Sequence, residues 1–405
     1  MASFFRVGMM PALFLGLIAV TVCGQAQAGG QLTQDSSYQA ANTLEQQGNF
    51  PDAEAAWHAV LKAHPASAEA YAHLGLLEAR QEHYKEAVPL YRKALALQPS
   101  MPSLRLNLGL ALFKAGELKQ AIVDFQPLLA KAQAGSPEAQ RLTILLGMAH
   151  YGVDDYVPAS HYLKEAAARD PQNLQLRLAL AHSCLWSKQY QCVLDAYHEM
   201  LTLNAESAEV DMLAGEAEDA MKDYDAAIEQ FRAAIKANPK EPEVHFGLGY
   251  ILWTQRRYPD AATEFQVELA NNPGHAQALE YLGDADIQMN HPELAPALLK
   301  KAVAIAPGLE LAHLDLGVLA ADAGRDDEAL QELKLAARLA PEDVNAHWHL
   351  GRLYRAMGDK AQAMVEFNKA NSLHKATNDA LLARMNGKHA QAAPSPEPGA
   401  ATPQP

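Results

Sequence analysis

Hydrophobic and small residues recur along most of the chain at a fixed spacing, with prolines between the groups. The separations between these prolines are 34, 72, 68, 34, 34 and 34 residues. The 72-residue gap is two periods plus a four-residue insertion near Ala134–Pro137. The prolines are Pro65, Pro99, Pro171, Pro239, Pro273, Pro307 and Pro341. A sustained period of this length is typical of a repeat array, and the alignment predicts ten repeats. Their first residues are Gln34, Ala68, Pro102, Gln140, Leu174, Ala208, Pro242, Ala276, Glu310 and Val344.

Each repeat is predicted to form two antiparallel helices. The eighth position is Gly or Ala in all ten repeats, and the twentieth is Ala in nine, with Val193 as the exception. Small residues let two helices approach closely, and proline near position 32 ends the second helix because it has no N–H to donate. The twenty-fourth position is always large and is expected to fill the space between the helices. It holds Trp57, Tyr91, Phe125, Leu163, Tyr197, Phe231, Phe265, Leu299, Leu333 and Phe367.

The pattern resembles the tetratricopeptide repeat family. The shared features are the 34-residue period, the Leu-Gly pair of the first helix, and the Ala, aromatic and Pro positions of the second. The resemblance is best in 68–101 and 344–377 and covers about 34–377. It implies an all-α, right-handed superhelical solenoid of about ten helix-turn-helix repeats. Repeat 174–207 departs from the pattern, with Val193, Met200 and Ala205 at positions that are usually Ala, small and Pro.

The segments outside the repeats predict export and a short tail. Residues 1–28 are interpreted as a signal peptide, because Arg6 and an apolar stretch precede a small-residue cleavage site, Ala26-Gln27-Ala28. A lipid anchor at Cys23 and an uncleaved anchor are the alternatives. The repeats, 34–377, follow a short linker, 29–33. We then expect a capping helix over 378–389 and a disordered, Pro- and Ala-rich tail over 390–405. The protein is therefore expected in the periplasm or outside the cell, with no membrane span after signal cleavage.

Charge and motifs limit the classes of function. The chain has 33 Lys and Arg against 48 Asp and Glu, a net charge of −15, which argues against a nucleic-acid partner. The sequence holds no HExxH, Gly-x-Ser-x-Gly, Walker-type or EF-hand motif. Among its sixteen histidines, His347 and His349 are two apart and face different sides of a helix, unlike a metal-binding pair. We expect no enzyme activity, no cofactor and no metal site.

Two cysteines fall in one repeat. Cys184 and Cys192 occupy positions 11 and 19 of repeat 174–207, on either side of the turn between its two helices. In an oxidising compartment a disulfide can form across such a turn. The alternative is a pair of buried thiols that act as small hydrophobic residues.

The tetratricopeptide resemblance implies that the first helix of each repeat lines a concave groove. Between positions 102 and 255 the expected groove residues are mainly apolar and aromatic, which is typical of a binding surface. They are Leu106, Asn107, Leu110, Phe113, Met148, Tyr151, His182, Trp186, Phe246, Tyr250 and Trp253. The alternative is that some of them form the core between helices. Toward the C-terminus the same positions become polar, with Glu280, Asp284, Asp315, Asp322, His349, Arg352 and Arg355.

These observations predict a scaffold for protein–protein interaction. The expected partner is an apolar peptide or helix of another protein, held in the concave groove. The alternative is a structural subunit of a bacterial envelope or export assembly that uses its convex face. Neither the identity of the partner nor the oligomeric state follows from the sequence.

Overall fold

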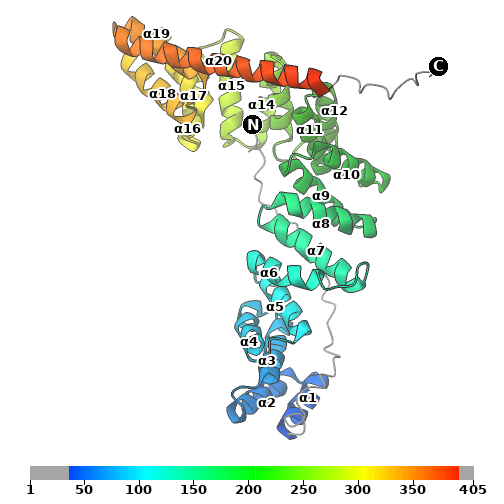
Figure 1. Ribbon diagram of the computed structural model, residues 1–405. Coiled ribbons are helices and arrows are strands. Elements are labelled where there is room, and N and C mark those ends of the chain that lie inside the picture. Colours follow the sequence, from blue (N-terminus) through cyan, green and yellow to red (C-terminus); the bar gives the residue numbers. More distant parts are fainter. Residues whose placement is uncertain (1–35, 206, 392–405) are drawn as a thin grey trace, which may run out of the picture. The chain divides into compact units, whose positions relative to one another are not determined.

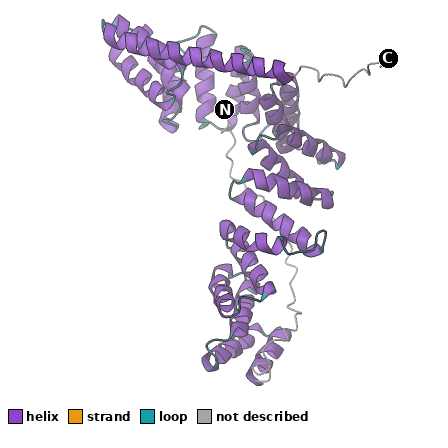
Figure 2. Cartoon of the chain, in the orientation of Figure 1, coloured by secondary structure: helices purple, strands orange, loops and turns teal. Residues whose placement is uncertain are grey.

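The computed structural model of the chain describes residues 36–205 and 207–391, which form twenty α-helices joined by turns (Figures 1 and 2). The predicted signal peptide and linker lie outside the described residues, as does the tail beyond Gln391. The helices are α1 (Ser36–Gln46), α2 (Phe50–Ala63), α3 (Ala68–Arg80), α4 (Tyr84–Leu97), α5 (Pro102–Lys114), α6 (Leu118–Leu129), α7 (Pro137–Gly152), α8 (Tyr156–Arg169), α9 (Leu174–Trp186), α10 (Tyr190–Thr202), α11 (Ala208–Met221), α12 (Tyr224–Ala237), α13 (Val244–Thr254), α14 (Tyr258–Asn271), α15 (Ala276–Gln288), α16 (Ala295–Ile305), α17 (Glu310–Asp322), α18 (Asp326–Leu339), α19 (Val344–Ala356) and α20 (Lys360–Gln391).

The helices alternate as the repeat pattern predicts, and the all-α fold class is confirmed. In seven of the ten repeats the odd-numbered helix begins at the predicted first residue of the repeat. The helix α7 begins three residues earlier than predicted, at Pro137 within the insertion. Proline suits the first turn of a helix, and the Ser136 hydroxyl caps this one by accepting a hydrogen bond from the Ala139 N–H at 3.1 Å.

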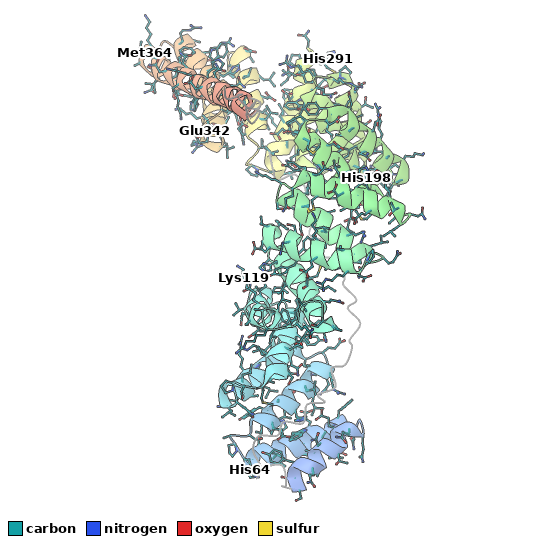
Figure 3. All side chains as sticks on the ribbon, turned by 45° about the vertical axis from the view of Figure 1, so that its right-hand side comes forward. His64, Lys119, His198, His291, Glu342 and Met364 are labelled. Carbon is teal, nitrogen blue, oxygen red and sulfur yellow. A yellow bond between two sulfur atoms is a disulfide. The ribbon has the colours of Figure 1, made fainter. Side chains whose placement is uncertain are left out.

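The last helix is longer than the repeat pattern predicts. The predicted capping helix over 378–389 is the C-terminal part of α20, which continues without a break from Lys360. The sequence explains the continuity, because position 32 of this repeat is Lys375 and not proline. Figure 3 shows the side chain of Met364 on this helix, and it is 67% exposed. No helix in the described residues is both long enough and apolar enough to cross a membrane.

The chain divides into two compact units, residues 1–230 and 231–405, with the boundary inside α12. Within each unit, helices that follow one another in the sequence pack together, and several neighbouring odd-numbered helices also touch. Examples are α7 with α9 in the first unit and α15 with α17 in the second. Within the described residues, the even-numbered helices make no comparable contacts with one another. The odd-numbered helices therefore share one surface in each unit, here named the odd-helix face.

The two helices of a repeat are held together by a large side chain seated on a glycine. The ring of Tyr91 lies against Gly75 and the side chain of Leu333 against Gly317, each pair 16 residues apart. A Cβ atom added to Gly317 would lie 2.6 Å from Leu333 Cγ and 3.1 Å from its backbone nitrogen. Such distances are too short for carbon contacts. Where position 8 is glycine, its small size is thus required by the large residue at position 24, which is buried in most repeats and half-buried at Tyr197 and Phe367.

A polar contact repeats with the same spacing in the second unit. His245, His313 and His347 are buried, and each ring Nδ1 lies 2.6 Å from a glutamate 19 residues later, namely Glu264, Glu332 and Glu366. Each Nε2 lies 3.1–3.2 Å from the carbonyl oxygen of the proline that ends the preceding repeat. Carboxylate and carbonyl oxygens accept hydrogen bonds, so a ring N–H directed at either one is the donor of that contact. Each imidazole therefore links both helices of its repeat to the repeat before it.

The glycine contact predicts different outcomes for two nearby glycine substitutions. Gly317→Ala should destabilise the protein by about 1–3 kcal/mol, because the new methyl group overpacks against Leu333. Gly308→Ala is the matched control, since nothing lies within 4 Å of its added Cβ. It should change stability by less than about 1 kcal/mol. Urea unfolding of both variants measures the difference, and equal midpoints would contradict the proposed packing constraint.

The histidine contact predicts that a double substitution is milder than a single one. Glu332→Leu should cost about 1–3 kcal/mol, because it leaves a buried imidazole nitrogen without its partner. Adding His313→Leu should restore most of that stability, since the repeat of α15 and α16 carries Leu279 and Leu298 at the same two positions. Thermal unfolding of the single and double variants provides the test. If the double variant were less stable than the single variant by the full cost of His313→Leu alone, the two side chains would not interact.

Candidate partner-binding surfaces

In the first unit, most of the predicted groove residues are half-buried on the odd-helix face. Leu106, Leu110 and Phe113 of α5 pack against the core below them and keep part of their surface exposed. Tyr151 of α7 and Trp186 of α9 are likewise partly exposed. Asn107 and His182 lie between these apolar residues and are also half-buried. The face therefore offers apolar surface with a few polar groups among it.

Four aromatic side chains gather where α7, α8 and α9 meet. The ring of Trp186 stacks on Tyr156 with the centroids 6.1 Å apart, and Tyr151 lies edge-on to Tyr156 at 6.2 Å. The ring of His182 lies 6.4 Å from Tyr151, and its Nε2 is 3.1 Å from a carboxylate oxygen of Glu209 on α11. Tyr156 is not among the predicted groove residues, because it is the first residue of an even-numbered helix. We name this set of four residues the aromatic group.

A shallow apolar pocket lies at the other end of α9. Its volume is about 270 Å³. Leu178 of α9 lines this pocket. It lies on the same side of α9 as His182, one helical turn further on, and Trp186, two turns further on. The pocket includes Met200 and Ala205, two of the three residues at which this repeat departs from the pattern. The full lining is Leu174, Gln175, Leu178, Met200, Ala205, Ser207 and Val210.

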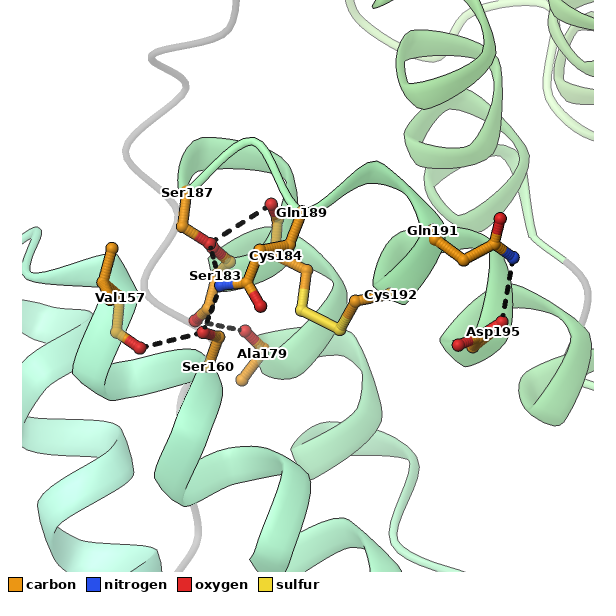
Figure 4. The surroundings of a disulfide bond; sticks show 10 residues. All are labelled: Val157, Ser160, Ala179, Ser183, Cys184, Ser187, Gln189, Gln191, Cys192 and Asp195. Carbon is orange, nitrogen blue, oxygen red and sulfur yellow. Dashed lines mark hydrogen bonds between the residues drawn. A yellow bond between two sulfur atoms is a disulfide. The ribbon is translucent and has the colours of Figure 1, made fainter. Parts of the chain in front are cut away.

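The same repeat contains a disulfide, shown in Figure 4. Cys184 of α9 and Cys192 of α10 are joined across the turn, with their Cα atoms 5.8 Å apart. This separation is normal for a disulfide. Next to it, the amide of Gln189 donates to the hydroxyl oxygens of Ser160 and Ser187, both at 2.8 Å. These bonds tie the turn between α9 and α10 to α8.

Three predicted groove residues belong to the core. Met148 of the first unit and Phe246 and Tyr250 of the second are 5%, 1% and 9% exposed. Phe246 packs in a cluster of rings that includes Phe265 at 5.9 Å and Tyr281 at 6.0 Å. Their inward positions on the helix place them under the surface, because neighbouring helices cover them. The alternative interpretation, a core between helices, is correct for these three.

Trp253 remains partly exposed on the odd-helix face of the second unit. Its indole N–H donates to Asp284 at 2.5 Å, and its ring lies 4.9 Å from that of Tyr281. The structure thus divides the predicted groove residues between the two units and places Trp253 next to acidic residues rather than in an apolar groove.

Four carboxyl groups, named here the carboxyl cluster, lie on α15 and α17: Glu280, Asp284, Glu310 and Asp315. Burial raises the pKa of Glu280 to about 7. The pKa of Asp315 is well above its usual range because the group is buried and faces Asp284, Glu280 and Glu310. Burial and the neighbouring Asp343 raise the pKa of Glu310. In the described parts of the chain, these four carboxyls make no ion pair with Lys, Arg or His.

Two members of the carboxyl cluster have hydrogen bonds that account for their burial. Glu280 accepts a bond of 2.9 Å from the Ala312 N–H, and so caps α17 from the neighbouring helix. Asp284 accepts from the amide of Gln288 at 3.2 Å as well as from Trp253. Asp315 differs, because it is 9% exposed and its buried Oδ2 has no hydrogen-bond partner. Within residues 36–205 and 207–391, no three His, Cys, Asp or Glu side chains are arranged to hold a metal ion.

Family models described as tetratricopeptide repeat match residues 38–102, 75–137, 212–276, 252–310, 282–344 and 344–376. These ranges cover more than half of the chain and follow the repeats seen in the structure. The chain belongs to the tetratricopeptide repeat family. The matched ranges do not include 138–211, the part that contains the disulfide and the apolar pocket.

Curated relatives are distant and much longer. The chain is 23% identical to anaphase-promoting complex subunit 3 of Schizosaccharomyces pombe over 285 residues, which is 70% of this chain and 43% of the relative. It is 23% identical to cellulose synthase operon protein C of Xanthomonas axonopodis pv. citri over 391 residues, 93% of this chain and 24% of the relative. The chain thus spans less than half the length of these two relatives.

Solved structures share the repeat fold in part. A structure titled as YrrB, a tetratricopeptide protein with an unusual peptide-binding site, is 20% identical, with a TM-score of 0.37. The similarity covers 47% of this chain and 98% of that one. A MamA structure from Desulfovibrio magneticus RS-1 is 22% identical, with a TM-score of 0.37, over 42% of this chain and 96% of that one.

Proposed function

We propose that the protein is an exported, non-enzymatic scaffold that binds an apolar peptide or helix of a partner protein on the odd-helix face of its first unit. The observation that supports this proposal most directly is the side of α9 formed by Leu178, His182 and Trp186. Leu178 opens onto an apolar pocket at one end, and Trp186 joins the aromatic group at the other. A pocket of about 270 Å³ is large enough for one apolar side chain of a peptide.

Membership in the tetratricopeptide family supports a binding role, because relatives in this family assemble with proteins or peptides. The partly exposed residues on α5 and α7 extend the apolar surface beyond α9. Large aromatic side chains that are partly buried on a surface are frequent hot spots of binding. They are already held by their neighbours, so little side-chain entropy is lost when a partner arrives.

The test compares two double variants with the same number of truncated apolar side chains. The partner is first identified by crosslinking in the native compartment, and its affinity for the purified protein is then measured by titration. Leu178→Ala with Trp186→Ala should weaken binding at least tenfold, since loss of a hot-spot residue costs about 2 kcal/mol or more. Val123→Ala with Val157→Ala is the control. These valines are 67% and 65% exposed on the even-numbered helices α6 and α8.

Circular dichroism should show that both double variants remain helical and melt cooperatively. A partner that binds the Leu178 and Trp186 variant as tightly as the wild type would contradict the proposed surface. If the valine variant alone lost binding, the even-numbered helices would be the interface, as in the alternative of a structural subunit.

Export is a second part of the proposal. It is supported by the signal-like pattern of residues 1–28 and by the disulfide of Cys184 and Cys192, since structural disulfides persist in oxidising compartments. Mass spectrometry of protein from the source cells should find a mature N-terminus at Gly29 and no free thiol at either cysteine. A version without residues 1–28, retained in the cytoplasm, should carry both cysteines as thiols. An acylated N-terminus at Cys23 or an unprocessed chain would contradict cleavage after Ala28.

A further inference from the structure

The last repeat has two arginines at positions where no other repeat carries lysine or arginine. Arg352 and Arg355 occupy positions 9 and 12 of repeat 344–377, and both side chains are exposed. The guanidinium carbon of Arg352 lies 5.0 Å from the ring centre of Trp348, and that of Arg355 lies 5.5 Å from the ring centre of Phe367. Within residues 36–205 and 207–391, neither arginine forms an ion pair with an aspartate or a glutamate. A guanidinium that lies over a ring keeps its N–H edges available for a carboxylate.

The apolar side chains around these arginines occupy positions that the next repeat covers elsewhere in the array. At position 21, Val88 and Ala262 are 3% and 5% exposed, whereas Met364 of the last repeat is 67% exposed. At position 5, Leu314 is 7% exposed and Trp348 is 45% exposed. The reason is that α20 continues as a single helix, so no odd-numbered helix follows it among the described residues. We name the resulting surface the end face, formed by Trp348, Arg352, Arg355, Met364 and Phe367.

Two contacts inside the array show what positions 9 and 12 meet on the next odd-numbered helix. His182, at position 9, has its Nε2 3.1 Å from a carboxylate oxygen of Glu209, at position 2 of α11. Trp253, at position 12, donates its indole N–H to Asp284, at position 9 of α15. In both cases the partner is a carboxylate. A helix on the end face would therefore meet the two arginines with its own positions 2 and 9, which are seven residues apart and lie on the same side of a helix.

The junction before the last repeat shows which apolar pattern such a helix needs. There α19 packs on α18 through Ala346, Leu350 and Leu353, at positions 3, 7 and 10, which are 0–3% exposed. They share a cluster with the residues at positions 5 and 24 of the repeat before, Leu314 and Leu333. The end face presents the same two positions. It is therefore suited to a helix with apolar residues at its positions 3, 7 and 10.

We propose that the end face binds an acidic, amphipathic helix of a partner protein, which packs where a further odd-numbered helix would lie. Carboxylates at positions 2 and 9 of that helix pair with Arg352 and Arg355 respectively, and its apolar residues cover Trp348 and Met364. Arginine suits this role because its planar guanidinium can hold a carboxylate through two parallel N–H bonds. The end face belongs to the second unit and binds a charged partner. The inference is therefore independent of the apolar surface proposed in the first unit.

A second copy of the chain fits the end face less well than an acidic partner. Residues 344–391 hold seven Lys and Arg against three Asp and Glu, so two end faces that met about a two-fold axis would repel each other. The first helix of another copy, α1, has Ser36, Ala40 and Thr43 at positions 3, 7 and 10, which are small or polar. The odd-numbered helix with carboxylates at positions 2 and 9 is α11, and it is already packed against α9 and α10.

The probe is a capped, alanine-rich helical peptide as long as α19, with leucine at positions 3, 7 and 10 and glutamate at positions 2 and 9. One control peptide has glutamine at positions 2 and 9. A second control carries the two glutamates at positions 4 and 11, on the other side of the helix, so that its net charge is unchanged. In titration calorimetry with the full-length protein, the probe should bind about tenfold more tightly than either control, because both controls lack the two exposed guanidinium–carboxylate pairs. Added salt should reduce this difference.

Two double variants with the same loss of charge locate the site. Arg352→Gln with Arg355→Gln should weaken binding of the probe about tenfold and leave binding of the glutamine peptide unchanged. Arg232→Gln with Lys236→Gln, at exposed positions of α12, is the control and should change the affinity less than about twofold. Equal losses in the two double variants would mean that the net charge of the protein, and not the end face, governs binding.

The apolar part of the end face has a control in the adjacent residue. Met364→Ala should weaken binding of all three peptides about threefold or more, because the partner helix buries this side chain. Val365→Ala should leave the three affinities unchanged. Val365 is 56% exposed at position 22, where other repeats have polar residues such as Asp195 and Glu229. Equal effects of the two substitutions would contradict packing on the end face.

The remaining outcomes identify other occupants. Absence of binding at about 1 mM probe, or equal affinities for the probe and the peptide with displaced glutamates, would overturn the inference. Dimerisation in sedimentation that Met364→Ala abolishes would assign the end face to a second copy. Binding of phosphatidylglycerol vesicles that requires Arg352 and Arg355, without binding of the probe, would assign it to a membrane surface. The double variant of Leu178 and Trp186 should bind the probe like the wild type, so a failure here leaves the proposed function intact.

Discussion

The contact between a glycine on one helix and a large side chain on the next determines most of this structure. Helix pairs such as α17 and α18 can lie close enough for Leu333 to rest against Gly317 only because no Cβ occupies that space. The same contact recurs with a 16-residue spacing at Gly75, Gly109, Gly249 and Gly351. Since most of the pairs are built around it, with Ala41 and Ala181 in place of glycine in two repeats, the odd-numbered helices present equivalent positions on one face. Whatever the protein binds there depends on that arrangement.

The equivalent positions carry different chemistry in the two units. In the first unit the odd-helix face has apolar and aromatic side chains that remain partly exposed, whereas in the second it has buried carboxyls beside Trp253. The two positions of the histidine–glutamate pair also vary in chemistry without a change of fold, since one repeat has two leucines there. The repeat thus fixes the backbone and leaves a few positions open to be apolar, paired or charged.

The sequence predicts the helices well because the repeat multiplies a weak signal by ten. It predicts the first residue of seven odd-numbered helices, and it misses α7 because the insertion adds a helical turn at Pro137. The site is less predictable. Position in the repeat indicates which way a side chain points but not what covers it, so Phe246 and Tyr250 were assigned to a groove although they lie in the core. The histidine–glutamate pairs can be predicted from the sequence, because a histidine at position 4 is followed by a glutamate 19 residues later. Nothing in the sequence indicates that the Oδ2 of Asp315 has no hydrogen-bond partner.

The disulfide has a further consequence for how the array holds together. In a stack of repeats each unit contacts only its neighbours, so cooperativity passes along the chain through one interface after another. The bond between Cys184 and Cys192 joins residues eight apart and therefore adds nothing between repeats. What it does is restrict the two helices of the repeat that departs most from the pattern, where Val193 and Ala205 replace the usual Ala and Pro. Reduction would thus weaken one link in the middle of the first unit, and the repeats on either side of it would then unfold more independently.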